Sequence, residues 1–169
     1  MRTILLITTS LLWALCVNAQ KGLFVTSKAF TNNDTIPAKY SCDGENINPP
    51  LDVLNIPTGT KSFAVIVHDA DADTLGGYTH WVVWDILPDN PVTENYKGSK
   101  QGLNSAGTKG YTGMCPQKDK HHYTFKVYAL DIARLTIPPD ASKALLESAM
   151  REHTLGVGTL TGLYQRKGK

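Results

Sequence analysis

Two apolar runs joined by a short polar segment constrain the fold of this chain more than any other feature. Residues 61–67 are rich in β-branched side chains, and residues 79–87 are apolar on both faces of a strand. Runs of this length and composition are typical of buried β-strands, and the second is expected near the centre of a sheet or sandwich. The segment between them carries Asp69, Asp71 and Asp73 at alternate positions, so polar groups stand between two buried elements.

Further strands and one helix are predicted along the chain. Residues 121–131 alternate between two sets of side chains, which indicates a strand with distinct faces. Short strands are also expected at residues 23–27 and 158–165. A short helix is predicted before the last of these strands, capped by Asp140 and ending just before Gly156.

The composition favours a turn-rich β or α+β fold. The chain contains nine prolines and fourteen glycines among its 169 residues, which indicates many turns. Neither a repeat nor an interdomain linker is evident, and the length suggests a single domain over residues 20–169. The polar stretch over residues 88–120 is long for a loop, and we expect it to be ordered and functional.

Residues 1–19 have the pattern of a secretory signal. Arg2 provides a positive start, an apolar stretch follows, and the VNA triplet at residues 17–19 fits a small-x-small cleavage site. We expect cleavage after this triplet, with Gln20 as the new N-terminus and export to the periplasm or the exterior. An uncleaved anchor is the alternative, but the apolar stretch is short and interrupted for a membrane span. We therefore expect no membrane span after cleavage.

Removal of this segment leaves two cysteines and an almost balanced charge. Cys42 and Cys115 remain, and an even number of cysteines in an exported protein permits a disulfide, with two separate thiols as the alternative. The loss of Arg2 leaves 16 basic against 15 acidic residues, so the net charge falls from +2 to +1. This charge is too small for a nucleic-acid footprint, and nucleic acid is not predicted as a partner.

Polar side chains are predicted to meet at one end of the sheet. Asp69 and Asp71 follow the first strand, His80 opens the second, and His121 opens a later one. If neighbouring strands are antiparallel, these groups lie at the same end, where loops on a rigid β scaffold commonly carry binding groups. The sequence therefore predicts one cleft that these side chains line.

Several chemistries fit such a cluster. Carboxylates beside imidazoles favour cationic histidine, which attracts anions, and backbone N–H groups of residues 110–113 could add donors for a phosphate. Histidine and aspartate also bind zinc, but no His-x-x-x-His spacing accompanies the Asp-x-Asp, so neither a metal nor a cofactor is predicted. Turn capping by the aspartates and core hydrogen bonding by the histidines remain the structural alternative.

A series of short motifs follows in order through the chain from residue 23 to residue 166. They are Ser27-Lys28-Ala29-Phe30, Tyr40-Ser41-Cys42-Asp43-Gly44, Asn46-Ile47-Asn48-Pro49-Pro50-Leu51, Asp69-Ala70-Asp71-Ala72-Asp73, His80-Trp81-Val82-Val83, Gly110-Tyr111-Thr112-Gly113-Met114-Cys115-Pro116, His121-His122-Tyr123 and Tyr128-Ala129-Leu130-Asp131. In order and spacing the series resembles the phosphatidylethanolamine-binding protein family, in its bacterial Raf-kinase-inhibitor-like (YbhB/YbcL-like) branch.

The resemblance implies a mainly β fold, an antiparallel β-sandwich with a few short peripheral helices. It also implies a small pocket for phosphate-like anions, including the phospholipid headgroup phosphorylethanolamine. Eukaryotic relatives bind kinases or other proteins, so a protein partner is a further expectation. Matched to the motifs, the pocket residues would be Asp69, Asp71, His80, Tyr111, Gly113, Pro116, His121 and Tyr123.

Five positions depart from the family pattern. Ala70, Asp73 and Met114 stand where the family has prolines, which should loosen the loops because proline fixes φ. Asp73 also adds negative charge near a proposed anion site. His122 replaces the usual arginine, and Asn48 replaces the usual serine. We therefore expect a pocket that is retained but retuned.

The favoured hypothesis is an exported, non-enzymatic binding protein with an anion or phosphate-headgroup pocket. The alternative is a protein-interaction or inhibitor module, acting on a kinase or a protease, whose pocket receives a side chain of the partner. A hydrolase is the least favoured reading, because the sequence has no evident nucleophile or metal-ligand set to accompany a histidine base.

Overall fold

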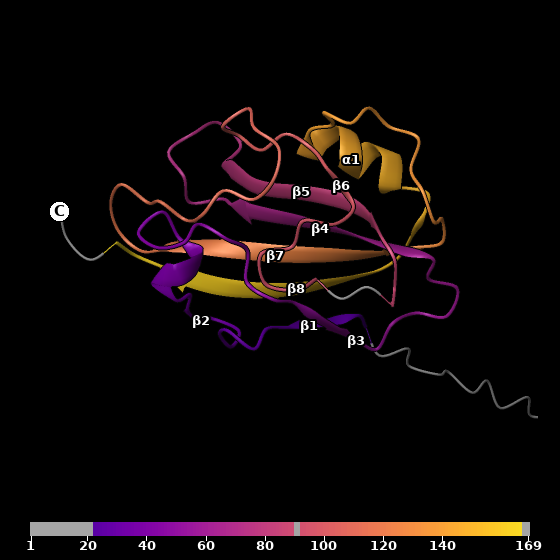
Figure 1. Cartoon of the computed structure of the whole chain (residues 1–169), viewed down its shortest axis with the longest axis horizontal. Coiled ribbons are helices and arrows are strands. Elements are labelled where there is room, and N and C mark those ends of the chain that lie inside the picture. Colours follow the sequence, from indigo (N-terminus) through magenta and orange to yellow (C-terminus); the bar gives the residue numbers. More distant parts are fainter. Residues whose placement is uncertain (1–21, 90–91, 167–169) are drawn as a thin grey trace, which may run out of the picture.

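A six-stranded sheet runs through the centre of the molecule (Figure 1). The structure is a computed structural model that describes residues 22–89 and 92–166, so the predicted signal segment lies outside it. The strand order is β2-β8-β7-β4-β5-β6, and every neighbouring pair is antiparallel except β2 and β8. The strands are β2 (Asp34–Thr35), β4 (Ser62–Asp69), β5 (Tyr78–Ile86), β6 (Lys100–Gln101), β7 (His121–Leu130) and β8 (Thr154–Tyr164).

The second layer is much smaller than the central sheet. Strands β1 (Phe24–Thr26) and β3 (Asp52–Leu54) form an antiparallel pair. Within the described residues the helical elements are one α-helix, α1 (Lys143–Met150), and one 3-10 turn (Ala38–Tyr40). The predicted mainly β sandwich is therefore confirmed, with its second sheet reduced to two short strands.

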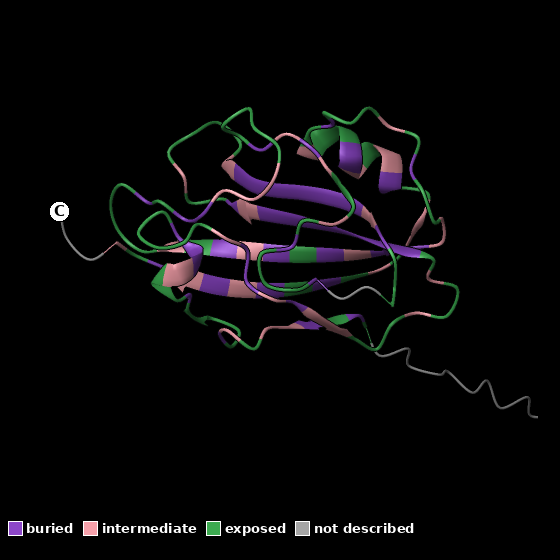
Figure 2. Ribbon diagram, viewed as in Figure 1, coloured by how far each residue is buried: buried purple, intermediate pink, exposed green. Residues whose placement is uncertain are grey.

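Strands β4 and β5 are buried along almost their whole length, whereas β7 and β8 alternate between buried and more exposed positions (Figure 2). Strands β4 and β5 are covered on both faces. One core packs Val65, Trp81 and other side chains of the sheet against β1 and the loops. The other core packs Ile66 and Trp84 against Leu146 and Met150 of α1. This two-sided cover accounts for the continuous apolar character of the second run, although β5 lies next to the edge of the sheet and is flanked on that side by the two-residue β6.

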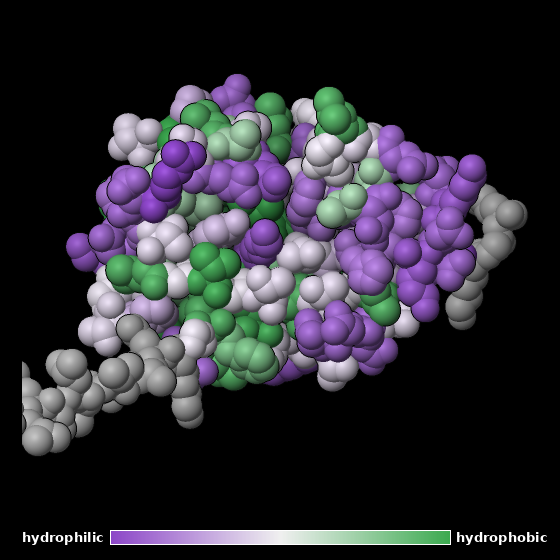
Figure 3. Space-filling model, turned by 180° about the vertical axis from the view of Figure 1, so that it is seen from behind, coloured by the Kyte–Doolittle hydropathy of each residue, from purple (hydrophilic) through white to green (hydrophobic). Residues whose placement is uncertain are grey.

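Apolar surface gathers on the lower part of the molecule when it is seen from behind, the part in which β1 and β3 lie (Figures 1 and 3). Phe24 and Leu54 are opposite each other in this strand pair and are about half exposed. Leu155 and Val157 on β8 are also exposed.

Helix α1 starts and ends differently from the sequence prediction. Asp140 does not cap it, because residues 138–141 form a turn in which the N–H of Ala141 donates to the carbonyl of Pro138. The cap is Ser142, whose backbone is extended and whose hydroxyl accepts from the N–H of Leu145. The helix ends at Met150, so Gly156 lies inside β8 rather than just after the helix.

The polar stretch over residues 88–120 is tied to the sheet at several points. Strand β6 lies within it and pairs with β5, with Trp84 opposite Lys100. Isolated bridges join Leu103 to Lys109 and Ser41 to Met114. The predicted order of this stretch is confirmed for its described part.

Candidate functional site

The ends of three strands meet around a cavity of about 600 Å³. Asp69, at the end of β4, is opposite Tyr78 of β5 on one side and Tyr123 of β7 on the other. His80 and His121 lie near the starts of the same two neighbouring strands. Antiparallel pairing thus brings together groups that are distant in sequence, as the sequence predicted. Of the predicted site residues, the cavity wall includes Asp69, Asp71, His80, Gly113, Pro116, His121 and Tyr123.

A buried carboxylate orients one histidine. Oδ2 of Asp69 lies 2.8 Å from Nδ1 of His121, and Oδ1 of Asp69 accepts the backbone N–H of Asp71 at 2.9 Å. Asp69 is only 3 % exposed, so both of its oxygens are committed inside the protein. Because Nδ1 of His121 donates to a carboxylate, Nε2 is the ring nitrogen left for a ligand.

The second histidine is buried and has one ring nitrogen without a partner. Nδ1 of His80 lies 2.8 Å from the carbonyl oxygen of Thr112 and donates to it. Nε2 of His80 is buried and makes no hydrogen bond to any described residue. Burial lowers the pKa of His80, so the ring is neutral and Nε2 carries a lone pair. A buried lone pair without a partner is costly unless a ligand or water supplies the donor.

Tyr123 places a second unpartnered group beside the first. Its ring lies edge-on to His80 at 5.3 Å and stacks on His121 at 6.3 Å between centroids. Its hydroxyl is buried and has no hydrogen-bond partner among the described residues. Burial, then the charge of Asp69 and a weak interaction of the hydroxyl with the same carboxylate, raise the pKa of Tyr123. Asp69 does not meet the geometry of a hydrogen bond with this hydroxyl, which therefore keeps its proton and can donate it to a ligand.

Asp71 attaches the loop at the rim of the cavity to β7. Its Oδ2 accepts from the backbone N–H of His122 at 2.8 Å and lies 2.7 Å from Nδ1 of the same residue. These two hydrogen bonds with His122 lower the pKa of Asp71. The histidine that replaces the family's usual arginine therefore clamps the loop that contains Asp71.

A disulfide and an asparagine fix the opposite wall. Cys42 and Cys115 are joined in a disulfide, and Cys115 lines the cavity. The bridged alternative of the sequence analysis is thus the one found. Next to it, the N–H of Gly113 donates to Oδ1 of Asn46 at 2.6 Å. This backbone donor, expected to face a phosphate, is already occupied inside the protein.

Tyr111 lies outside this cavity, in contrast to the prediction. Its hydroxyl donates to the carbonyl of Tyr40 at 2.8 Å, and its ring packs edge-on against Trp81 at 6.0 Å. These contacts hold the side chain on the other side of the Tyr111–Gly113 segment, where it lines a second cavity. The motif match gave the right segment, but the direction of each side chain depends on the path of the loop.

Several residues of the cavity wall were not predicted from the sequence. The ring of Tyr78 lies 4.8 Å from that of His80. Lys118 and Lys120 carry positive charge to the rim, while Asp73 and Asp119 carry negative charge. Tyr78 directly precedes the predicted strand 79–87 and could have been found from this place, because the strand in fact begins one residue earlier. The others lie on loops, whose path the residue pattern does not specify.

The described residues contain no group of three histidine, cysteine, aspartate or glutamate side chains placed to hold a metal ion. In the same residues, no helix has the length and apolar character needed to cross a membrane.

The sequence profile of the phosphatidylethanolamine-binding protein family matches residues 26–165. A UPF0098 protein of Pyrococcus horikoshii is 41 % identical, and the alignment covers 97 % of this chain and 88 % of that protein. The UPF0098 protein YbcL of Escherichia coli is 33 % identical, with 96 % of this chain and 98 % of that protein covered.

Solved structures agree with these relatives. The crystal structure of a putative phosphatidylethanolamine-binding protein homologue from Chlamydia trachomatis superposes with a TM-score of 0.82 at 36 % identity, covering 86 % of this chain and 99 % of that one. The structure of E. coli YbcL, described as a member of the mammalian PEBP family, gives a TM-score of 0.80 at 30 % identity, with 87 % and 100 % covered. The chain belongs to the phosphatidylethanolamine-binding protein family and is of the UPF0098 type.

Proposed function

We propose that this chain is an exported, non-enzymatic binding protein whose cavity at His121 takes a phosphate-bearing headgroup. The observation that carries the proposal is the pair of buried, unpartnered atoms in the wall, Nε2 of His80 and the hydroxyl of Tyr123. Buried polar groups in native proteins are nearly always hydrogen-bonded, so two neighbouring exceptions that line one cavity indicate a missing partner. Nε2 of His121, oriented by Asp69, adds a third polar atom to the set.

The protonation states of Tyr123 and His80 suit a phosphate that either carries a proton itself or causes His80 to take one up. The hydroxyl of Tyr123 is a donor, whereas neutral His80 offers a lone pair. A monoprotonated phosphate oxygen can donate to that lone pair. A dianionic phosphate would instead favour protonation of the imidazole, because a nearby negative charge stabilises the cationic form. In both cases the complex holds one proton more than neutral His80 and a dianionic phosphate would hold together.

The charges of the wall favour a headgroup that also contains a cation. Asp71, Asp73 and Asp119 contribute carboxylates around the mouth, against Lys118 and Lys120. A bare dianion would meet net repulsion there. A phosphate joined to an ammonium, as in phosphorylethanolamine, can place each charge beside its opposite.

Export is part of the proposal and is supported by two features. Residues 1–19 have the pattern of a secretory signal. The Cys42–Cys115 disulfide is a bond that persists mainly in oxidising compartments. Fractionation of the source cells, followed by mass spectrometry of the N-terminus, tests this part. A cytosolic protein that retains its first residues would contradict it.

Calorimetric titration with phosphorylethanolamine tests the binding function. The wild-type protein should bind phosphorylethanolamine more tightly than inorganic phosphate or ethanolamine, and His121→Ala should abolish the preference. His153→Ala is a matched control, because Nδ1 of His153 pairs with Asp131 at 2.9 Å on the surface, away from the cavity. Equal affinity in wild type and His121→Ala would refute the proposed site. Turnover of p-nitrophenyl phosphate would refute the non-enzymatic part.

A second candidate function is an interaction module that receives a phosphorylated or acidic side chain of a partner protein. The observation that favours it is Leu75, a fully exposed leucine in the rim loop that follows the wall residues Asp73 and Thr74. An apolar side chain beside a polar cavity suits a protein contact. Capture of an envelope protein that depends on both Leu75 and His121 would support it. Capture that is unchanged in Leu75→Ser and His121→Ala would count against it.

A further inference from the structure

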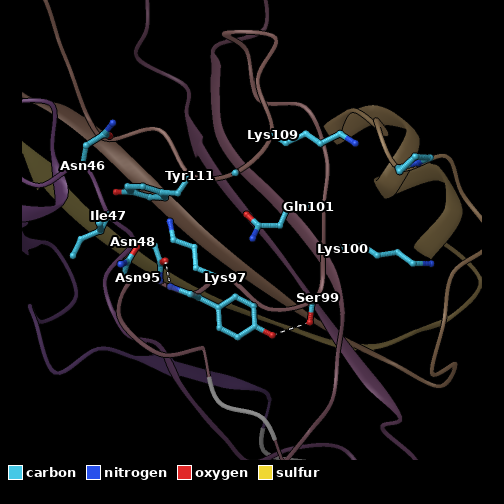
Figure 4. A pocket seen from close by; sticks show the side chains of 13 residues that line it. Asn46, Ile47, Asn48, Asn95, Lys97, Ser99, Lys100, Gln101, Lys109 and Tyr111 are labelled. Atoms are coloured by element: carbon cyan, nitrogen blue, oxygen red, sulfur yellow. Dashed lines mark hydrogen bonds between the residues drawn. The ribbon is translucent and has the colours of Figure 1, made fainter.

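A second cavity, of about 460 Å³, opens on the other side of the Tyr111–Gly113 segment. It lies among three loops, around residues 46–48, 95–101 and 109–111, and shares no wall residue with the cavity at His121. In Figure 4, Asn46, Ile47 and Asn95 stand on one side and Lys100 and Lys109 on the other, with Tyr111, Lys97 and Gln101 between them. Its volume is in the range of small-molecule sites.

The charge of this wall is entirely positive. Lys97, Lys100 and Lys109 line the cavity, and no aspartate or glutamate does. Lys100 is compensated by Asp85, whose Oδ2 lies 3.1 Å from the ammonium nitrogen. Lys97 and Lys109 make no ion pair with any described residue. Both lysines are exposed, and Figure 4 shows the ammonium of Lys97 directed towards Tyr111 and that of Lys109 directed away from it. After a change of the Lys109 rotamer, the two ammonium groups could meet on a ligand of charge −2, and lysine is a common phosphate ligand.

The other groups of the wall suit a hydroxyl-rich body. In the described part of the chain, the side-chain amide of Asn95 makes no hydrogen bond, and Asn46 uses its oxygen alone, for the N–H of Gly113. Both amides can therefore exchange hydrogen bonds with ligand hydroxyls. Two residues of the wall, Gln101 and Tyr111, are held in place by Trp81. The indole N–H of Trp81 donates to Oε1 of Gln101 at 2.9 Å, and the Trp81 ring packs edge-on against Tyr111.

We propose that this second cavity binds the phosphomonoester of a small polyol or sugar. Lys97 would hold the phosphate, and Lys109 would join it by a change of rotamer. The amides of Asn46 and Asn95 would bind hydroxyls, and Tyr111 would form an apolar wall. The site is independent of the headgroup site, since neither His80 nor His121 contributes to it.

Titration with glucose 6-phosphate, followed by calorimetry and amide NMR, tests the proposal. Glucose 6-phosphate should bind more tightly than glucose or inorganic phosphate and should shift the amides of Asn95, Lys97 and Gly110. The Lys97→Ala/Lys109→Ala double variant should lose roughly tenfold or more in affinity, because two charge-assisted contacts are removed. Raised ionic strength should also weaken binding by the wild type.

Two control variants keep the test specific. Lys28→Ala/Lys61→Ala removes two exposed lysines outside both cavities and should bind like the wild type. His121→Ala should also bind glucose 6-phosphate normally, which separates this site from the headgroup site. The proposal would be overturned if Lys97→Ala/Lys109→Ala bound glucose 6-phosphate as tightly as the wild type does, or if inorganic phosphate bound as tightly as glucose 6-phosphate. It would also be overturned if the amide shifts were confined to the His121 cavity, or if no binding occurred at millimolar concentration.

Discussion

Asp69 and His121 face each other across the adjacent strands β4 and β7, with Oδ2 of the carboxylate 2.8 Å from Nδ1 of the imidazole. The antiparallel register makes this contact possible, because it sets Asp69 opposite Tyr123, two residues after His121. The carboxylate is buried and the imidazole is 16 % exposed, so the pair joins the core of the protein to the wall of the cavity.

Removal of the charge on Asp69 should damage both stability and binding. Asp69→Asn leaves one acceptor oxygen for two donors, the ring N–H of His121 and the backbone N–H of Asp71, so one of these donors faces the amide N–H of the asparagine. We expect a loss of about 1–3 kcal/mol in the free energy of unfolding, because a buried donor is left without an acceptor. Urea unfolding measures this loss, and titration with phosphorylethanolamine should show weaker binding. Asp131→Asn disrupts the surface pair with His153 and should change stability by less than about 0.5 kcal/mol. Equal effects of the two substitutions would contradict the structural role of Asp69.

The protein should lose stability as the pH falls below 6.5. Burial lowers the pKa of His80 from 6.5, and burial together with Lys143 lowers that of His68. The two histidines therefore take up protons at a higher pH in the unfolded chain than in the folded one. Their contribution to the free energy of unfolding is constant above pH 6.5 and decreases as the pH falls towards the pKa of each histidine in the folded protein. Urea unfolding at several pH values between 8 and 5 would reveal this slope.

His80→Asn isolates the share of His80 in that slope. Asparagine can still donate to the carbonyl of Thr112 but does not titrate. The variant should therefore show a shallower decrease of stability with acid, with the remainder due to His68. A slope equal to that of the wild type would show that His80 does not enter the pH dependence.

Reduction of the disulfide should destabilise the fold and loosen the cavity wall. Cys42 and Cys115 are separated by 73 residues. In the chain-entropy account, closing a loop of this size stabilises the protein by about 4 kcal/mol. The Cys42→Ser/Cys115→Ser variant should lose part of this in guanidinium unfolding, and its affinity for phosphorylethanolamine should fall because Cys115 lines the cavity. A variant with wild-type midpoint and affinity would disprove both statements.

Gly113 should not tolerate a side chain. A Cβ there would lie 2.7 Å from Oδ1 of Asn46 and 2.7 Å from the carbonyl carbon of Ser41, and the second of these is backbone. Gly113→Ala is expected to cost about 1–3 kcal/mol, as overpacked sites do. Gly22→Ala is the matched control, since nothing lies within 4 Å of its added methyl. Comparable melting temperatures for the two variants would refute the close packing of this wall.

The sheet could be predicted from the sequence because its central strands have a simple burial pattern. The apolar runs at β4 and β5 are continuous since both faces are covered, and the alternation in β7 reflects one buried and one more exposed face. The meeting of Asp69, His80 and His121 followed from antiparallel pairing alone. The short strands β2, β3 and β6 were not predicted, because two or three residues alone carry no periodic signal. Strand β1 is equally short but lies within a longer apolar run, residues 23–27.

The loop side of the site was less predictable. Tyr111 and Gly113 are neighbours in one motif, yet they face different cavities, because the hydroxyl of Tyr111 bonds to Tyr40 and the N–H of Gly113 to Asn46. Both partners lie more than sixty residues earlier in the chain. Contacts of this range depend on tertiary structure, and the pattern of a single segment does not contain them.

Residues 110–113 form a partition between the two cavities, because Gly110 and Tyr111 line one of them and Thr112 and Gly113 line the other. The hydrogen bond from the N–H of Gly113 to Asn46 ties this partition to the wall of the first cavity. Asn46 belongs to the wall of one cavity and Gly113 to that of the other. Substitutions in the partition should therefore show epistasis: combined with a change in either cavity, their effects on affinity will not add. Changes at Lys109 and Lys120, one in each cavity and neither in the partition, should add. Any engineering of one cavity can treat the lysines as separate positions, but it must treat Asn46 and Gly113 as a single unit.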